Sequence, residues 1–183
     1  MMAAQTAGQE APVLVVVDAD HEARATTEAA LLRRFGADYR VLTADSAQSG
    51  LAVLEQLAAD GDAVALIAAD LRLSDMEPVA VLDRAHALHR TASRVLLFPM
   101  DRHRTRIPLT ELPTLRRVTA LGQIDFWIVK GWVTPEEWLY PQVQEALSAW
   151  TAANRPRHVV YRIVGEQREP GEMHVSADEV GRA

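Results

Sequence analysis

The sequence predicts an α/β fold in which five parallel strands form a doubly wound sheet with helices on both faces. Short apolar runs rich in β-branched residues, such as 13–17 and 63–69, are typical of strands buried on both faces. Segments with a helical spacing of apolar residues alternate with these runs, which favours parallel strands joined by helices. Charged side chains directly follow several runs, and such sheets gather functional residues at the carboxyl ends of their strands.

The elements follow one another in a regular order. Gly36 suits the C-cap of the first helix, Ser46 suits the N-cap of the second, and Gly61 ends it. Apolar runs predict strands over 13–17, 39–42, 63–69, 94–98 and 124–129. Helical periodicity and caps predict helices over 21–35, 46–60, 78–89, 114–121 and 135–150.

The domain boundaries follow from the same pattern. Residues 1–11 resemble a disordered lead-in, and residues 12–152 hold the predicted α/β domain. The region of the fourth helix is predicted to be irregular, because prolines interrupt residues 99–122. Residues 153–183 form a C-terminal extension with one strand-like run, 158–164, and a polar end that we expect to be mobile.

Composition excludes several classes of function. The formal net charge of −6 gives no general attraction to nucleic acid or to an anionic membrane. No apolar run is long enough to span a bilayer, and the first residues lack the pattern of a secretory signal. Cysteine is absent, which excludes thiol catalysis and fits a cytoplasmic protein. The roughly 30 residues after the last helix are too few for an ordinary helix-turn-helix unit.

Polar residues that lie far apart in the sequence are predicted to meet at one edge of the sheet. Asp18 and Asp20 follow the first strand, Asp70 the third and Lys130 the fifth, while Phe98 ends the fourth. Because parallel strands present their carboxyl ends at the same edge, these residues should surround a common crevice.

These ordered acids and the strand-end lysine resemble the receiver domain of bacterial response regulators, which has a flavodoxin-like fold. The likeness covers roughly residues 12–152 and rests on VVVDAD, LIAADLRLSDM, VLLFPM and WIVKGW. In that family an acidic pair holds Mg²⁺, and an aspartate takes a phosphoryl group from a histidine kinase. A Thr or Ser and a Lys contact the phosphoryl oxygens. The resemblance implies two-component signalling, with the fourth and fifth α/β units as the usual partner or dimer surface.

Carried over by position, the family's roles fall on named residues. Asp70 takes the phosphoacceptor position, and Lys130 takes the position of the phosphate-binding lysine. Asp18 is the first acid of the pair, and Asp20 is close enough in sequence to join it in an acidic pocket. Asp18 and Asp70 are then the candidate Mg²⁺ ligands, and we expect them to bind the metal weakly.

Three positions depart from the family pattern. Ala19 stands where the second acid, a direct metal ligand, belongs. Phe98 stands at the Thr/Ser switch and has no hydrogen-bond donor, and Gly131 replaces the proline that normally follows the lysine. These departures predict a degenerate receiver, or pseudo-receiver, in which a Lys130–Asp70 ion pair replaces phosphate chemistry.

A closer resemblance is to receiver-like modules that precede thioredoxin-reductase-like flavoenzymes in actinobacteria. It rests on ALGQIDFWIVKGWVTPEEWLYP at 120–141 and on RIVGE at 162–166. The chain contains neither G-x-G-x-x-G nor CxxC, so the resemblance implies a stand-alone version of that module without the flavin domain.

The leading interpretation is a module that is not an enzyme and binds a protein partner, or forms a homodimer, through its fourth and fifth α/β units. One alternative is a working single-domain regulator phosphorylated on Asp70. Another is a phosphate-ester hydrolase that uses Asp18 and Asp20, whose D-x-D spacing matches some phosphatases.

Three further groups of residues have competing structural and functional interpretations. Trp132 and Trp138 would mark an interface if exposed, but most of the tryptophans should pack in the core. His86 and His89 are spaced to share a metal, yet no third ligand accompanies them, so we expect surface histidines. A basic stretch suits an anionic ligand or a solvated loop and comprises Arg102, His103, Arg104, Arg106, Arg116 and Arg117.

Overall fold

A computed structural model describes residues 11–98, 112–131 and 134–154 of the chain. In these ranges it contains a five-stranded sheet of order β2-β1-β3-β4-β5 in which all neighbouring strands are parallel. The strands are β1 (Val13–Val17), β2 (Arg40–Ala44), β3 (Val64–Asp70), β4 (Ser93–Phe98) and β5 (Phe126–Val129). The helices are α1 (His21–Phe35), α2 (Ala47–Asp60), α3 (Pro78–Leu88), α4 (Leu112–Ala120), α5 (Pro135–Trp138) and α6 (Tyr140–Ala153).

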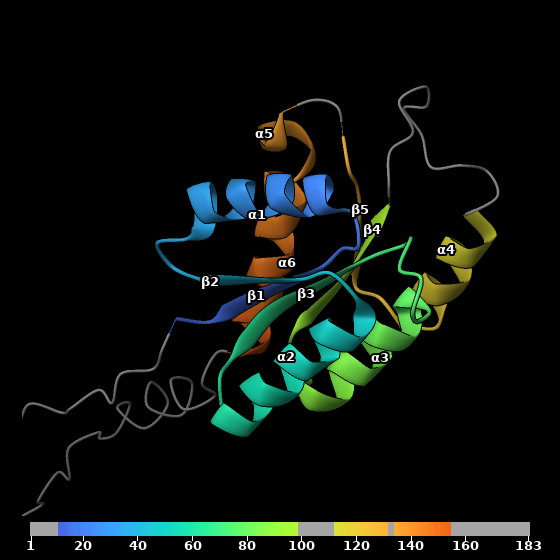
Figure 1. Ribbon diagram of the computed structural model, residues 1–183, viewed down its shortest axis with the longest axis horizontal. Helices are drawn as coiled ribbons and strands as arrows, with labels where there is room; N and C mark the ends of the chain where they lie inside the picture. Colours follow the sequence, from blue (N-terminus) through green and yellow to red (C-terminus); the bar gives the residue numbers. More distant parts are fainter. Residues whose placement is uncertain (1–10, 99–111, 132–133, 155–183) are drawn as a thin grey trace, which may run out of the picture.

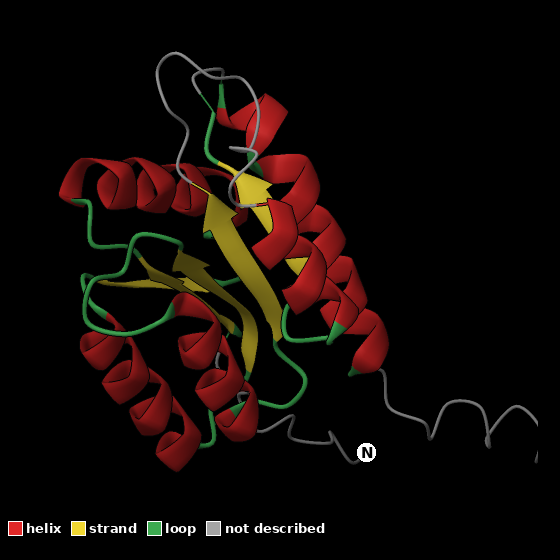
Figure 2. Cartoon of the chain, turned by 90° about the vertical axis from the view of Figure 1, so that its right-hand side faces the viewer, coloured by secondary structure: helices red, strands yellow, loops and turns green. Residues whose placement is uncertain are grey.

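Helices cover both faces of the sheet, as predicted for a doubly wound fold (Figures 1 and 2). Val13, Val15 and Val17 of β1 pack with α2, α3 and α4, whereas Leu14 and Val16 pack with α1, α5 and α6. This alternation follows from the two-residue period of a strand, which sends successive side chains to opposite faces. Because both faces are buried, every residue of β1, β3 and β4 is buried.

Local signals set several helix boundaries. Ser46 accepts a hydrogen bond from the Ser49 backbone N–H, and the Ser49 side chain completes the capping box of α2. Gly61 ends α2 with φ of 77°, a left-handed conformation that favours glycine. Both predictions from sequence are confirmed, as is the Gly36 C-cap of α1.

Several observed elements depart from their predicted bounds, most clearly the last helix. The last helix is divided, because Pro141 has no N–H to donate into a continuous helix, so α5 ends at Trp138 and α6 begins at Tyr140. The fifth strand starts at Phe126 instead of Ile124, because the Asp125 carboxylate accepts a hydrogen bond from the Arg94 backbone N–H. The second strand lies two residues later than predicted at its carboxyl end.

Three predicted regions fall wholly or mostly outside the described residues. These are the lead-in, the first part of the proline-interrupted region, at 99–111, and most of the C-terminal extension, including the strand-like run 158–164. Within the described ranges, no helix combines the length and the apolar character needed to cross a membrane.

Candidate functional site

The carboxyl edge of the sheet brings Asp18, Asp70 and Lys130 into direct contact. Lys130 Nζ lies 2.7 Å from Asp18 Oδ2 and also forms an ion pair with Asp70 Oδ2. Asp18 directly follows β1, Asp70 is the last residue of β3, and Lys130 directly follows β5. The parallel order β1-β3-β4-β5 therefore closes a cluster in which Asp18 and Lys130 are 112 residues apart in sequence. We call these three residues the acid–lysine cluster.

The donors around this cluster already engage its carboxylate oxygens. Asp18 Oδ1 accepts the Asp20 backbone N–H at 3.0 Å, and Asp70 Oδ1 accepts the Arg72 backbone N–H at 2.7 Å. The remaining oxygen of each carboxylate faces Lys130. The cluster is also nearly closed to water, since the side chains of Asp18, Asp70 and Lys130 are only 1%, 4% and 14% exposed.

Burial and charge act in opposite directions on Asp18. Burial raises the pKa of the Asp18 carboxyl above its usual value, because desolvation penalises the charged form. The hydrogen bond and the charge of Lys130 lower the pKa without cancelling this effect, and the neighbouring charge of Asp70 raises it further. The lysine therefore compensates only part of the cost of holding a carboxylate here.

A second cation, Arg24, borders the cluster and was not predicted from the sequence. Its Nη1 donates to the Asp18 carbonyl oxygen at 2.6 Å. Hydrogen bonds, chiefly from the Ala23 N–H to Asp20 and from the Ser49 hydroxyl to Asp45, lower the pKa of these two carboxyls, and the charge of Arg24 adds to the effect. Arg24 lies in the first turn of α1, where the only sequence signal is its position four residues after a helix-capping aspartate.

Asp20 does not join the pocket to which the sequence assigned it. Its side chain is exposed and accepts the backbone N–H groups of Glu22 and Ala23, both at 3.0 Å, as the N-cap of α1. These bonds favour the carboxylate and lower its pKa. The physical reason is the free N–H groups of the first helical turn, which bind a side chain placed directly before them.

Phe98 packs in the core and does not fill the crevice. It is 2% exposed within the layer of α2, α3 and α4, and its ring meets that of Trp127 edge-on with centroids 6.4 Å apart. Trp127 itself is 44% exposed. The position of the family's switch residue is thus linked by one ring contact to an exposed aromatic side chain on β5.

Trp138 is buried, as expected for most of the tryptophans, so the alternative of an exposed aromatic patch does not hold for Trp138. Trp132 lies outside the described residues. Trp138 packs on Gly131, where an added Cβ would come within 3.1 Å of the Trp138 Cβ and Cγ atoms. Because residue 131 has no side chain, the Trp138 indole can pack directly on the backbone that follows Lys130.

Asp75, in the loop after β3, is another residue that sequence reasoning missed. Its carboxylate accepts the backbone N–H groups of Ala47 at 3.1 Å and Gln48 at 3.0 Å, and these bonds lower its pKa. The loop that follows Asp70 is therefore attached to the N-terminus of α2.

The remaining candidates are dispersed. His89 is buried with Nε2 2.9 Å from the Leu54 carbonyl oxygen, so the expectation of a surface histidine is wrong there. Arg116 and Arg117 are exposed on α4, and residues 102–106 of the basic stretch lie outside the described ranges.

The described residues fit a divalent cation poorly. Mg²⁺ requires near-octahedral oxygen ligands, and Ala19 supplies none. The carboxylate oxygens of Asp18 and Asp70 already face a lysine or a backbone N–H. Among the described residues, no group of three or more His, Asp or Glu side chains is arranged to hold a metal ion.

Comparison with known proteins shows the fold. No protein-family model and no curated protein matches the sequence. A CheY-like response regulator receiver domain protein from Methanospirillum hungatei is 23% identical and has a TM-score of 0.59, with 79% of this chain and 100% of that chain covered. A receiver domain protein from Clostridium thermocellum is 13% identical, with a TM-score of 0.60 over 78% and 98% of the two chains.

The chain has the receiver fold. A structure described as an adenylate cyclase from Rhodopirellula baltica is also similar, at 16% identity and a TM-score of 0.61 over 87% of this chain and 100% of that one. These low identities establish the CheY-like arrangement of strands and helices, and the chemistry of the site has to be argued from its own residues.

Proposed function

We propose that this chain is a pseudo-receiver: a cytoplasmic signalling module of receiver fold that binds another protein and is not switched by conventional phosphorylation of Asp70. The supporting observation is the acid–lysine cluster, in which Lys130 and backbone N–H groups engage the oxygens of both buried carboxylates. Transfer of a phosphoryl group requires its developing charge to be neutralised, normally by a metal and a cation together. Here the only cation in the cluster is already paired with two acids.

The substitution at the switch position supports the same proposal. A hydroxyl at position 98 would bond a phosphoryl group, but the Phe98 ring offers no donor and is packed in the core. Burying such a ring contributes about 2 kcal/mol of stability, which opposes its movement into the crevice. The residue at this position therefore supports a module in which a phosphoryl group is not coupled to a change of shape.

Partner binding is proposed at the surface formed by α4, β5 and α6. A groove of about 380 Å³ lies there between Thr119 at the end of α4, Phe126 and Trp127 of β5, and Gln142 and Glu145 of α6. An exposed tryptophan beside a groove is typical of an interface anchor. The ring contact of Trp127 with Phe98 links this surface to the end of β4.

The geometry does not favour the hydrolase alternative. A D-x-D phosphatase needs both carboxylates at the substrate, whereas Asp18 faces Lys130 and Asp20 caps α1. The phosphorylatable alternative is the competing outcome of the following experiment.

The test is phosphorylation with acetyl phosphate and Mg²⁺, read by intact mass and by tryptophan fluorescence, with Asp70→Asn as the control. We expect no adduct on the native chain. The matched variant is Ala19→Asp, which restores the missing acid at an exposed position and should increase phosphorylation if the metal ligand is the limiting group. Stoichiometric modification of the native chain that Asp70→Asn abolishes would overturn the proposal.

A further inference from the structure

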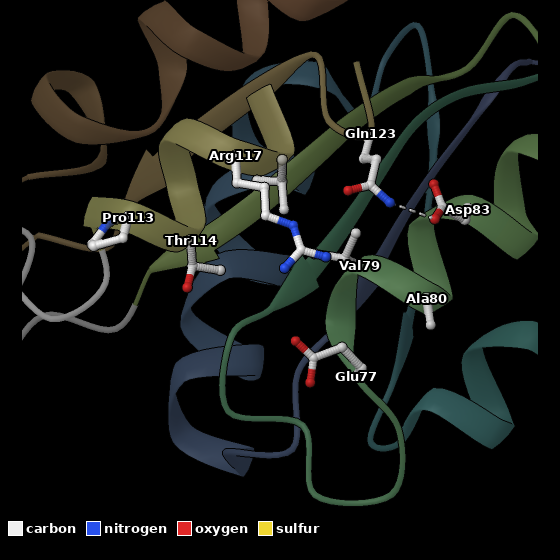
Figure 3. Close-up of a pocket in the computed structure, with 9 residues that line it drawn as sticks. Glu77, Val79, Ala80, Asp83, Pro113, Thr114, Arg117 and Gln123 are labelled. Atoms are coloured by element: carbon white, nitrogen blue, oxygen red, sulfur yellow. Dashed lines mark hydrogen bonds between the residues drawn. The ribbon is translucent and has the colours of Figure 1, made fainter. Parts of the chain in front are cut away.

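A groove of about 470 Å³ separates α3 from α4, and none of the acid–lysine cluster residues lines it (Figure 3). Val79 and Ala80 of α3 and Val118 of α4 supply apolar lining. Gln123 Nε2 donates a hydrogen bond of 3.0 Å to Asp83 Oδ2 across one part of the groove. The volume is large enough to receive side chains from another molecule.

Two opposite charges face this groove from its two walls. Glu77 lies at the start of α3, and Arg117 projects from α4 toward the α3 side (Figure 3). In the part of the chain that the structure describes, neither side chain forms an ion pair, although five other ion pairs are made there. If a second copy is rotated by half a turn and placed on the groove, its cationic wall faces the anionic wall of the first copy, and the reverse. The groove is therefore complementary in charge to a second copy of itself.

We propose that the α3–α4 groove is the contact face of a symmetric homodimer. A two-fold axis along the groove places α4 of one copy over α3 of the other, so that Arg117 of each copy meets Glu77 of the other. This reciprocal contact is what an isologous interface requires, since the same patch serves both subunits. The proposal does not depend on the proposed function, which concerns the α4–β5–α6 surface.

Apolar side chains accompany these charges. Val79 and Ala80 of α3 and Val118 of α4 line the groove beside them, and a groove of mixed apolar and charged character favours a protein occupant over a small ion.

The experiment is sedimentation equilibrium of the full chain over a range of concentrations, with single and double charge reversals. Arg117→Glu and Glu77→Arg each place two like-charge contacts in the symmetric interface, so we expect each to weaken dimerisation at least about tenfold. The double variant Glu77→Arg/Arg117→Glu restores both pairs and should return the dissociation constant to near the native value. Arg116→Glu, an exposed neighbour that does not line the groove, is the matched control and should change little.

Three results would overturn the proposal. One is a native chain that stays monomeric up to about 1 mM, where even weak association is detectable. Another is a dimer that both single reversals leave unchanged. The third is failure of the double variant to restore association after both singles have weakened it. Circular dichroism of each variant checks that these exposed substitutions leave the fold intact.

Discussion

Aspartates at the carboxyl edge of the sheet occupy two different environments. Asp18 and Asp70, in the acid–lysine cluster, are buried and share one lysine. Asp20 and Asp75, at the rim, are exposed and cap helices through backbone N–H groups. Asp18 has a raised pKa and Asp20, only two residues away, has a lowered one. The surroundings of each aspartate therefore decide whether its ionised form lowers or raises the stability of the folded chain.

The largest expected effect is from Lys130→Met. Without its cation, the cluster leaves two buried carboxylates facing each other, so we expect a loss of about 3–5 kcal/mol in the free energy of unfolding at neutral pH. Urea unfolding measures it. The loss should shrink as the pH falls, because protonation of Asp18, whose pKa is raised by burial, relieves the repulsion.

Two companion variants isolate the role of charge. Arg116→Met removes an exposed cation that has no ion pair within the described ranges, and should cost little. Lys130→Met combined with Asp18→Asn and Asp70→Asn removes all the cluster's charges and should recover part of the stability. A Lys130→Met loss no greater than that of Arg116→Met would show that the buried ion pairs are not coupled as described.

The sequence predicted the cluster because it depends on strand order alone. Acids and a lysine directly after buried parallel strands must meet at one edge, and Asp18, Asp70 and Lys130 do. Arg24 and Asp75 were missed because their partners are backbone groups, which every residue carries and which produce no motif. Asp20 was assigned to the pocket although an acid directly before a helix is also an N-cap signal.

The same distinction explains the fold predictions. Buried strands and capped helices have strong local patterns, and the alternation of five strands with helices along the chain was predicted. The break at Leu139 between α5 and α6 was missed, although Pro141 marks it, because apolar spacing continues on both sides. The burial of Trp138 depends on its approach to Gly131, a tertiary contact without a local pattern.

A smaller effect is expected at the rim. Asp20→Ala leaves the N–H groups of Glu22 and Ala23 without their acceptor and should lower the free energy of unfolding by about 1 kcal/mol. Asp20→Asn keeps an acceptor oxygen and should cost clearly less. Denaturant unfolding of both variants makes the comparison, and equal losses would indicate that the charge, and not the capping bond, is what α1 needs.

The smallest effect is a difference in the sign of pH dependence between the two environments. The folded-state pKa of Asp18 lies above 3.8, so the folded chain takes up this proton first and gains stability from Asp18 as the pH falls toward 3.8. The folded-state pKa of Asp20 lies below 3.8, so its contribution is complete above that pH and is lost as the pH falls through the folded value. Because Asp20 is exposed, the change there should stay below about 1 kcal/mol.

Urea unfolding of the native chain, Asp18→Asn and Asp20→Asn between neutral and acidic pH measures both signs. As the pH is lowered toward 3.8, the free energy of unfolding of the native chain should rise relative to that of Asp18→Asn. Relative to Asp20→Asn it should fall only at lower pH. Asparagine is the appropriate substitute because it keeps the shape and an acceptor while removing the titration. If both differences changed in the same direction, Lys130 would have to hold Asp18 ionised as firmly as the helix N-terminus holds Asp20, and the partial compensation inferred for the cluster would be wrong.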